Sequence, residues 1–529
     1  MPIRTLRHAL IVTIVLALVP AGSMAQTASP PASAAASPAA SAAPITLEPF
    51  EDAAYGLRSV APAAWPEAGM GIRTRGGASG DPTLLALQSA PVPPDGLWPS
   101  LLPQLGLTSV PEPTDQRTTP AGLTWDLYRV PVGPTIADLG LAAAPGVTYL
   151  VLLVSSPTDR DALVDAVFLP AIDALEPLVA ERTPLPSGIG YSEEDITFPG
   201  GAADVTLAGT LTIPAGPGPH PAVVLMSGSG PQDRDESLPG MTLKPFALLA
   251  DALGRAGIAV LRYDDRGTAA STGDYGAATL AELTADGTAA LAWLRERPGI
   301  DATRTGVLGH SEGGAYIASI AAGDADVAFV VGLAPMVRAG IDLMLDQTYA
   351  IARSQGLTED QAQASVDANR RLYEAALESD ERLELVMQQV YGAAWEGLDE
   401  ATREQLGDRD AWIEQQVTTQ LPALSSAWFR SLLRSDPSAD WAKVDAPVLS
   451  VFGGKDVQVI AEPESAALEE ALEDRHARSR VEVLADANHL FQTAVTGGLE
   501  EYPTLDQTFI PELLPLVTDW IRGVTRLDG

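Results

Sequence analysis

The chain has 529 residues, of which 46% are hydrophobic and 19% charged, and its formal net charge at pH 7 is −36. This length and composition predict a globular protein with a large core and more than one domain. The acidic excess argues against nucleic acid or an anionic membrane as a partner, since both attract clustered lysine and arginine. The chain has no cysteine, which excludes a disulfide framework, and its few histidines are not spaced with carboxylates as metal ligands. We therefore expect neither a metal nor a cofactor.

The first 44 residues are predicted to lie outside the folded domains. Arg4 and Arg7 precede a short apolar run at 9–19, and a Ser-Met-Ala sequence ends at Ala25. These features are typical of a secretory signal peptide (residues 1–25) that is cleaved after Ala25, so we expect a secreted or extracytoplasmic protein. Membrane association would arise only through an uncleaved signal. Residues 26–44 are rich in Ala, Pro and Ser and predict a flexible linker.

Residues 45–184 predict a small α+β domain. Strand-like sequences occur at 125–130 and 147–154, and a helical pattern near 160–175 closes the segment. We assign no catalytic role to this domain.

Residues 190–529 predict a larger α/β domain. Strands are expected at eight places: 195–198, 205–213, 222–226, 258–263, 305–308, 327–333, 448–452 and 481–484. They alternate mostly with helical patterns, which predicts a largely parallel sheet flanked by helices. Between about 337 and 440 the alternation stops and charged helical periodicity replaces it. This segment predicts a helical cap over the carboxyl edge of the sheet, which would line the substrate pocket and exclude water.

The sequence GHSEG at 309–313 lies between the expected strand at 305–308 and a helix of small residues at 315–322. A serine in this pattern is typical of a nucleophile elbow, where flanking glycines let neighbouring backbones approach closely. Ser311 is therefore the candidate nucleophile. A GxSxG pattern alone is equally compatible with a structural turn, so the hypothesis depends on finding a base and an acid.

A serine hydroxyl needs a general base, and histidine is the usual one near neutral pH. Of the chain's five histidines, three are set aside because one lies in the signal segment, one precedes a strand and one belongs to the elbow itself: His8, His220 and His310. His489 follows the expected strand at 481–484 and a short turn, at the edge where α/β enzymes collect catalytic groups. His476 lies in a charged helix end and is the weaker alternative.

The third member of the triad is expected between the serine and the histidine in chain order. Asp456 follows a buried-strand pattern at 446–452 and a Gly-Gly turn, so it fits this order. Alone it would be an ordinary turn aspartate, and only its combination with Ser311 and His489 indicates catalysis. Asp445 and Asp486 are weaker alternatives.

Two backbone N–H groups are expected to stabilise the oxyanion, those of Glu312 and of Ser229 in the glycine-rich loop at 227–231. A structural role at the helix start is the default for the Glu312 side chain. The loop is not followed by Gly-Lys-Ser/Thr, which argues against nucleotide binding. Trp428 and Phe429 either line an acyl pocket or pack within the cap.

Six separated motifs occur in an order that resembles a known family: 228–236 (GSGPQDRDE), 262–267 (RYDDRG), 309–314 (GHSEGG), 428–430 (WFR), 455–459 (KDVQV) and 488–492 (NHLFQ). The chain resembles the α/β-hydrolase superfamily over about 190–525, and within it a bacterial carboxylesterase branch related to prolyl-oligopeptidase-like and serine-aminopeptidase-like hydrolases. The resemblance implies an α/β-hydrolase fold with Ser311, Asp456 and His489 as the triad. Ser227 departs from the pattern, because many relatives have histidine there.

These predictions together indicate an exported serine hydrolase that cleaves a small-molecule carboxylic ester through an acyl-enzyme intermediate. A peptidase or amidase with the same triad is the nearest alternative. A second alternative is a binding protein with an inactive hydrolase domain, whose N-terminal module would provide the function.

Overall fold

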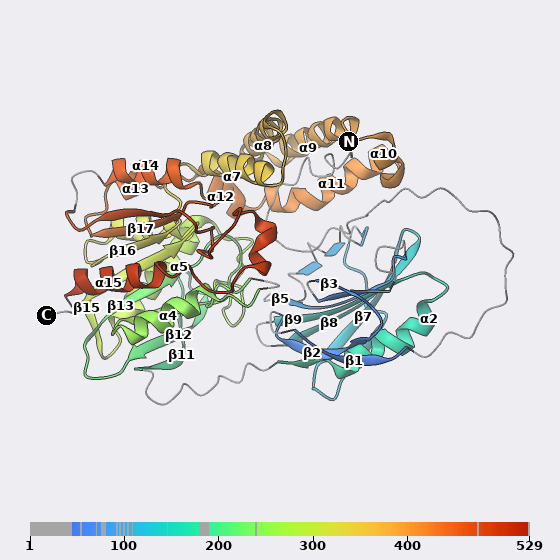
Figure 1. Cartoon of the computed structure of the whole chain (residues 1–529), viewed down its shortest axis with the longest axis horizontal. Helices are drawn as coiled ribbons and strands as arrows, with labels where there is room; N and C mark the ends of the chain where they lie inside the picture. The colour runs from blue at the N-terminus through green and yellow to red at the C-terminus, as the bar shows by residue number, and fades with distance from the viewer. Residues whose placement is uncertain are drawn as a thin grey trace. The chain divides into compact units, whose positions relative to one another are not determined.

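The computed structural model describes residues 45–526, apart from gaps at 53–54, 70, 76–80, 91–93, 95–96, 99–100, 103–104, 108, 145–146, 179–189, 239–240 and 473–475. The predicted signal peptide and linker lie outside the described residues. The chain divides between residues 181 and 182 into two compact units, which are coloured blue to teal and green to red in Figure 1. Within the described ranges, no helix combines the length and apolar character that crossing a membrane requires.

The N-terminal unit is built mainly of antiparallel strands. Its strands are β1 (Leu47–Asp52), β2 (Leu57–Pro62), β3 (Glu67–Gly69), β4 (Ile72–Thr74), β5 (Leu84–Ala90), β6 (Asp115–Thr118), β7 (Thr124–Val132), β8 (Thr135–Ala144), β9 (Val147–Ser155) and β10 (Glu176–Pro177). Seven of them form one sheet in the order β3-β4-β5-β9-β8-β7-β6, and β1, β2 and β10 form a smaller sheet. The helical segment expected near 160–175 is observed as α2 (Arg160–Leu163), a π-helical stretch (Val164–Phe168) and α3 (Leu169–Ala174). Its apolar side packs with Trp125, which is fully buried.

The second unit contains an eight-stranded sheet in the order β11-β12-β14-β13-β15-β16-β17-β18. The strands are β11 (Tyr191–Pro199), β12 (Thr206–Pro214), β13 (His220–Met226), β14 (Ala259–Tyr263), β15 (Ile300–His310), β16 (Val330–Leu333), β17 (Val448–Gly453) and β18 (Arg480–Leu484). The pairs from β14 to β18 are parallel, whereas β12 is antiparallel to both of its neighbours. This confirms the predicted, mostly parallel sheet. The strands β14, β16 and β17 are buried along their whole length, which explains why they read as continuous apolar runs.

Helices cover the sheet, and the direction of its parallel strands defines its carboxyl edge. They are α4 (Pro245–Arg255), α5 (Leu280–Arg295), α6 (Gly313–Gly323), α14 (Ala461–Ala471) and α15 (Leu513–Thr525). Helix α4 packs on β12 and β14, and α5 and α6 pack on β13 and β15. Because β13, β15 and β17 run parallel, the loops that follow them emerge at one edge of the sheet.

A helical insertion joins β16 to β17. It consists of α7 (Gly340–Ser354), α8 (Glu359–Glu378), α9 (Asp380–Glu396), α10 (Glu400–Leu406), α11 (Arg409–Leu424), α12 (Ala427–Arg434) and α13 (Ser438–Trp441). Several of its helices begin at a side chain that accepts a backbone N–H of the first turn, namely Thr358, Ser379, Asp399, Asp408 and Ser426. Such N-caps explain where these helices start. Figure 1 shows α7 to α12 grouped together in yellow and orange.

Candidate active site

Ser311 lies between the end of β15 and the start of α6, with a backbone φ of 55°. A serine in this left-handed conformation is unusual and requires support from its surroundings. The support is backbone hydrogen bonding, because the Ser311 N–H donates to Leu333 O at 3.0 Å and the Ser311 carbonyl accepts from Gly314 and Met336, each at 2.9 Å. The turn is therefore fixed to the end of β16, as a nucleophile elbow requires.

The glycines that flank Ser311 are required by the backbone. A Cβ atom at Gly309 would lie 2.3 Å from Gly313 O, and one at Gly313 would lie 2.4 Å from Met226 O. Atoms cannot approach this closely without displacing the main chain. The spacing of glycines around Ser311 thus reflects close contact between β13, β15 and α6.

Asp456 and His489 lie side by side at the same sheet edge. Asp456 follows β17, and its Oδ2 is 2.7 Å from His489 Nδ1. The other oxygen, Oδ1, accepts the backbone N–H groups of Gln458 at 2.7 Å and Val459 at 2.9 Å. Both side chains are buried. Because the carboxylate accepts a hydrogen bond from Nδ1–H, the Nε2 atom of His489 is left as the basic nitrogen.

The weaker sequence candidates lie elsewhere. Asp486 is paired at 2.9 Å with Lys455, and Asp445 is exposed. His476 Nδ1 accepts the backbone N–H of Arg478 within its own turn. None of the three is paired with His489 through a hydrogen bond between described residues.

The elbow and the His489 loop are in direct contact through His310. The rings of His310 and His489 lie 4.6 Å apart, and His310 Nε2 is 3.0 Å from the backbone oxygen of His489. On its other side, His310 Nδ1 is 2.7 Å from Glu236 Oε1. Both partners are hydrogen-bond acceptors, so only the charged imidazolium satisfies both. Burial alone would lower the pKa of His310, but the charge of Glu236 and the hydrogen bonds raise it above its ordinary value.

The pairing of His310 with Glu236 was not predicted from the sequence. A buried His–Glu pair between segments 74 residues apart has no local signature. The only signal in the sequence was that both residues lie in motifs that resemble the hydrolase family, at 228–236 and 309–314.

The Glu236→Gln substitution is expected to change how stability depends on pH. A histidine whose pKa is raised by folding stabilises the protein below its unfolded pKa of about 6.5, and this contribution is lost as pH rises through the folded pKa. Removing the charge of Glu236 should cost roughly 3 kcal/mol at pH 6, the scale of breaking a buried ion pair. It should also flatten the decline of unfolding free energy above pH 6.5. Chemical denaturation from pH 5.5 to 8.5 measures both.

The control for this prediction is His476→Gln, which removes a histidine outside the network and should leave the pH slope unchanged. An unaltered slope in Glu236→Gln would contradict the assignment of a charged His310.

The loop after β13 presents amides beside the elbow. A Cβ on Gly228 would lie 3.1 Å from Ser311 Cβ, so the loop contacts Ser311. The Gly228 N–H donates to Glu236 Oε1 and the Gly230 N–H to Tyr275 OH, each at 3.0 Å. Within the described ranges, the intervening Ser229 amide has no acceptor, and neither does the amide of Glu312. These two amides therefore have the capacity to donate to a further acceptor.

Residues 201–490, more than half of the chain, match the X-Pro dipeptidyl-peptidase (S15) family. The chain belongs to this family. Esterase EstD of Thermotoga maritima is 31% identical over 303 residues, which are 57% of this chain and 60% of that protein. The chain thus spans less than two thirds of the length of this curated relative. These matches confirm the predicted α/β-hydrolase superfamily and support an enzyme of the hydrolase type.

Solved structures are also similar to this S15 chain. The α/β hydrolase GrgF of Penicillium sp. sh18 aligns with 17% identity and a TM-score of 0.39, covering 63% of this chain and 99% of that chain. The Pyrococcus furiosus esterase Pf2001 aligns with 15% identity and a TM-score of 0.38, covering 64% and 93%.

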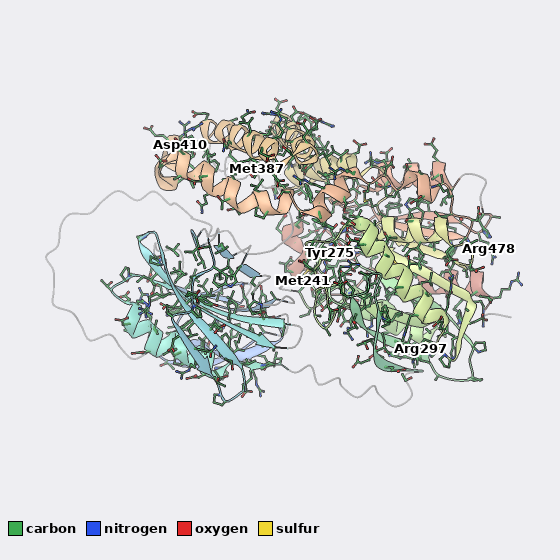
Figure 2. The ribbon with its side chains drawn as sticks, turned by 180° about the vertical axis from the view of Figure 1, so that it is seen from behind. Met241, Tyr275, Arg297, Met387, Asp410 and Arg478 are labelled. Carbon is green, nitrogen blue, oxygen red and sulfur yellow. The ribbon has the colours of Figure 1, made fainter. Side chains whose placement is uncertain are left out.

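Charged residues of the S15 region brace the loops around the elbow. Arg234 forms hydrogen bonds to both carboxylate oxygens of Asp264, and Arg266 binds Asp286 at 2.6 Å. Figure 2 labels Tyr275 in this part of the hydrolase unit and Met387 on α9 of the insertion. Among the described residues no group of three or more His, Asp or Glu side chains is placed to hold a metal ion.

The two cap aromatics have different surroundings. Trp428 Nε1 donates to Glu312 Oε1 at 3.0 Å, which places this indole beside the residue that follows Ser311. Phe429 is fully buried and packs edge-on against Tyr373 at 5.6 Å between ring centroids. Of these two aromatic residues, Trp428 is the one that is hydrogen-bonded to the elbow.

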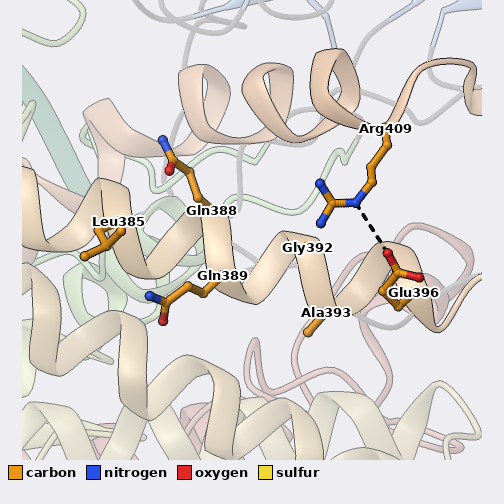
Figure 3. Close-up of a pocket in the computed structure, with 7 residues that line it drawn as sticks. All are labelled: Leu385, Gln388, Gln389, Gly392, Ala393, Glu396 and Arg409. Atoms are coloured by element: carbon orange, nitrogen blue, oxygen red, sulfur yellow. Dashed lines mark hydrogen bonds and ion pairs between the residues drawn. The ribbon is translucent and has the colours of Figure 1, made fainter.

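A groove on the insertion lies between α9 and the start of α11 (Figure 3). Its lining residues are Leu385, Gln388, Gln389, Gly392, Ala393, Glu396 and Arg409. Arg409 Nε donates to Glu396 Oε1 at 3.4 Å across it. It contains none of the residues predicted to act in catalysis.

Proposed function

We propose that this protein is a serine hydrolase that cleaves carboxylic esters through an acyl-enzyme intermediate. The observation that carries the proposal is the 2.7 Å contact between Asp456 Oδ2 and His489 Nδ1, in a loop that contacts the Ser311 elbow through His310. We assign Ser311 as the nucleophile, His489 as the general base and acid, and Asp456 as the group that orients the imidazole.

In the first step, His489 Nε2 removes the Ser311 hydroxyl proton as Oγ bonds to the ester carbon. The carbonyl oxygen becomes an oxyanion, which the amides of Ser229 and Glu312 stabilise. The tetrahedral intermediate then collapses, the C–O bond to the alcohol breaks, and His489 returns the proton to the leaving oxygen. In the second step, a water molecule attacks the acyl-enzyme by the same route and releases the carboxylic acid.

The preference for esters is supported by the similarity to a protein named as an esterase. The second candidate is peptide or amide hydrolysis, which the description of the matched family as X-Pro dipeptidyl-peptidase favours. The two reactions share the triad and differ in the leaving group, so the cap is expected to decide between them. We further propose that the protein is exported by its N-terminal signal and acts on a small-molecule substrate.

Labelling with a fluorophosphonate probe tests the proposed nucleophile. The full chain is expected to incorporate about one probe per molecule, and the labelled peptide should contain Ser311, because a triad serine is activated for phosphonylation. The same preparation is then assayed with p-nitrophenyl esters of several acyl lengths and with aminoacyl-proline anilides.

The expected result is faster ester cleavage, with a burst of p-nitrophenol. Faster anilide cleavage would support the peptidase candidate instead. A protein that is neither labelled nor active on either class would overturn the proposal and favour a binding protein.

A further inference from the structure

The carboxylate of Glu312 is the centre of a hydrogen-bond cluster beside the elbow. Its side chain is buried, and it accepts from Ser229 Oγ at 2.7 Å and from Trp428 Nε1 at 3.0 Å. It also accepts from the hydroxyl of Tyr316, one turn along α6. The three donors come from the loop after β13, from the cap helix α12 and from the helix that carries Glu312. One carboxylate therefore joins three separate segments.

This cluster changes the role expected for the Glu312 side chain. The default assigned from sequence was a structural charge at the start of α6, but the carboxylate makes no capping hydrogen bond there. Its partners are neutral donors rather than a cation. Burial raises the pKa of Glu312 above its ordinary value, and the hydrogen bonds from Tyr316, Trp428 and Ser229 offset this only in part. The ionised form suits this site, because a protonated carboxyl offers less acceptor capacity to the three donors.

The ionisable groups that interact with Glu312 are a carboxyl group and tyrosine hydroxyls. Asp265 and the hydroxyls of Tyr275 and Tyr316 interact with it electrostatically. Asp265 accepts hydrogen bonds from the Ser227 hydroxyl and from the Gln232 backbone amide. The ring of Tyr275 lies 6.2 Å from that of Trp428, so it is part of the same contact between the cap and the core. No compensating cation belongs to this set, so the buried carboxylate is held by hydrogen bonds.

The cluster connects the two amides assigned to the oxyanion hole. One donor is the Ser229 N–H and the other is the Glu312 N–H, and the side chains of these same residues are hydrogen-bonded to each other. The amides on either side of Ser229 are also anchored, to Glu236 and to Tyr275. The Ser229–Glu312 bond therefore joins the two residues whose amides are assigned to the oxyanion hole, in a loop that Glu236 and Tyr275 also anchor.

We propose that Glu312 is a positioning residue that fixes the oxyanion hole and makes its geometry depend on the seated cap through Trp428. This proposal rests on the proposed function. Donors aimed at a developing oxyanion must be held in place before the reaction, because reorientation during the reaction adds to the barrier. Loosening either contact should weaken binding of the transition state more than binding of the ester.

The test compares Ser229→Ala, Glu312→Gln and Trp428→Phe in the full chain. Ser229→Ala keeps the backbone amide and removes only the hydroxyl, at an exposed residue whose replacement does not threaten folding. We expect each variant to lower kcat for a p-nitrophenyl ester about 10-fold with little change in KM, the usual size of an effect from a supporting hydrogen bond. The double variant Ser229→Ala/Glu312→Gln should lose less than the product of the single losses.

A second measurement separates positioning from a general structural role. An alkyl boronic acid forms a tetrahedral adduct on Ser311 that places a negative oxygen in the oxyanion hole. Its affinity should fall about 10-fold in Ser229→Ala, in parallel with kcat, because both depend on the same donors. The matched control is Tyr316→Phe, which removes the one donor from within α6 and should affect boronate affinity least.

The outcomes distinguish this proposal from the proposed function. Failure of the wild-type chain to hydrolyse esters or bind the probe would remove the basis of both. An active wild type, with Ser229→Ala retaining full kcat and full boronate affinity, would overturn the positioning role alone. Strictly multiplicative losses in the double variant would also overturn it, because they would show that Ser229 and Glu312 act independently.

Discussion

Replacing Ser311 by alanine is expected to lower kcat for p-nitrophenyl esters by about 10⁶-fold, the size of the effect when the nucleophile of a serine hydrolase is removed. The physical reason is that no acyl-enzyme can form, while the amides of Ser229 and Glu312 and the pocket are retained. Steady-state assays and labelling by a fluorophosphonate probe measure the loss. The fold should remain intact, because the contacts that hold the elbow are backbone hydrogen bonds.

The matched control is Ser450→Ala. Ser450 is a buried serine on β17 whose hydroxyl has no partner among the described residues. Its removal should leave both activity and labelling unchanged. Undiminished turnover by Ser311→Ala, with its circular dichroism spectrum preserved, would exclude Ser311 as the nucleophile.

The Asp456→Asn substitution is expected to lower kcat by about 10⁴-fold, the scale measured for the equivalent change in another serine hydrolase. The asparagine oxygen can keep the two amide hydrogen bonds of Gln458 and Val459, which directs its NH₂ group at His489 Nδ1. The imidazole then carries its proton on Nε2 and cannot accept one from Ser311. Backbone geometry and KM should change little, so the loss should appear in kcat and in the rate of probe labelling.

Asp486→Asn provides the control, because Asp486 lies in the same loop region but pairs with Lys455. It should retain full activity. If Asp486→Asn lost activity and Asp456→Asn did not, the acid assigned from the structure would be wrong.

The strands of the hydrolase unit could be predicted from sequence because their signals are local. β16 and β17 are buried along their whole length and are mostly apolar, as strands covered on both faces require. The strand before Ser311 was predicted too short, at 305–308, whereas β15 begins at Ile300. Its first half contains polar and charged residues, so the alternation of a buried strand is missing there.

The contacts among the candidate site residues were less predictable. Asp456 and His489 were identified by chain order and by their position after strands, which is information that one sequence contains. The link from Glu236 through His310 to the His489 carbonyl depends on three segments that meet only in the folded chain. The same is true of Glu312, whose partners Ser229 and Trp428 lie 83 and 116 residues away. No local pattern distinguishes such side chains from ordinary polar residues.

The insertion of the cap between β16 and β17 has a consequence for how this enzyme class can diversify. These two strands are adjacent and paired in register from Val330 with Val448 to Leu333 with Val451. The chain thus leaves the sheet and returns to it at neighbouring positions. The hydrogen bonds between β16 and β17 do not involve the inserted segment. A different helical segment in place of residues 340–441 would leave the strand ends before Ser311 and Asp456 in their register, but it would have to replace the hydrogen bond from Trp428 to Glu312. Cap exchange is therefore expected to change the walls of the pocket while the Asp456–His489 pair is kept, provided that the new cap retains a hydrogen-bond donor to Glu312.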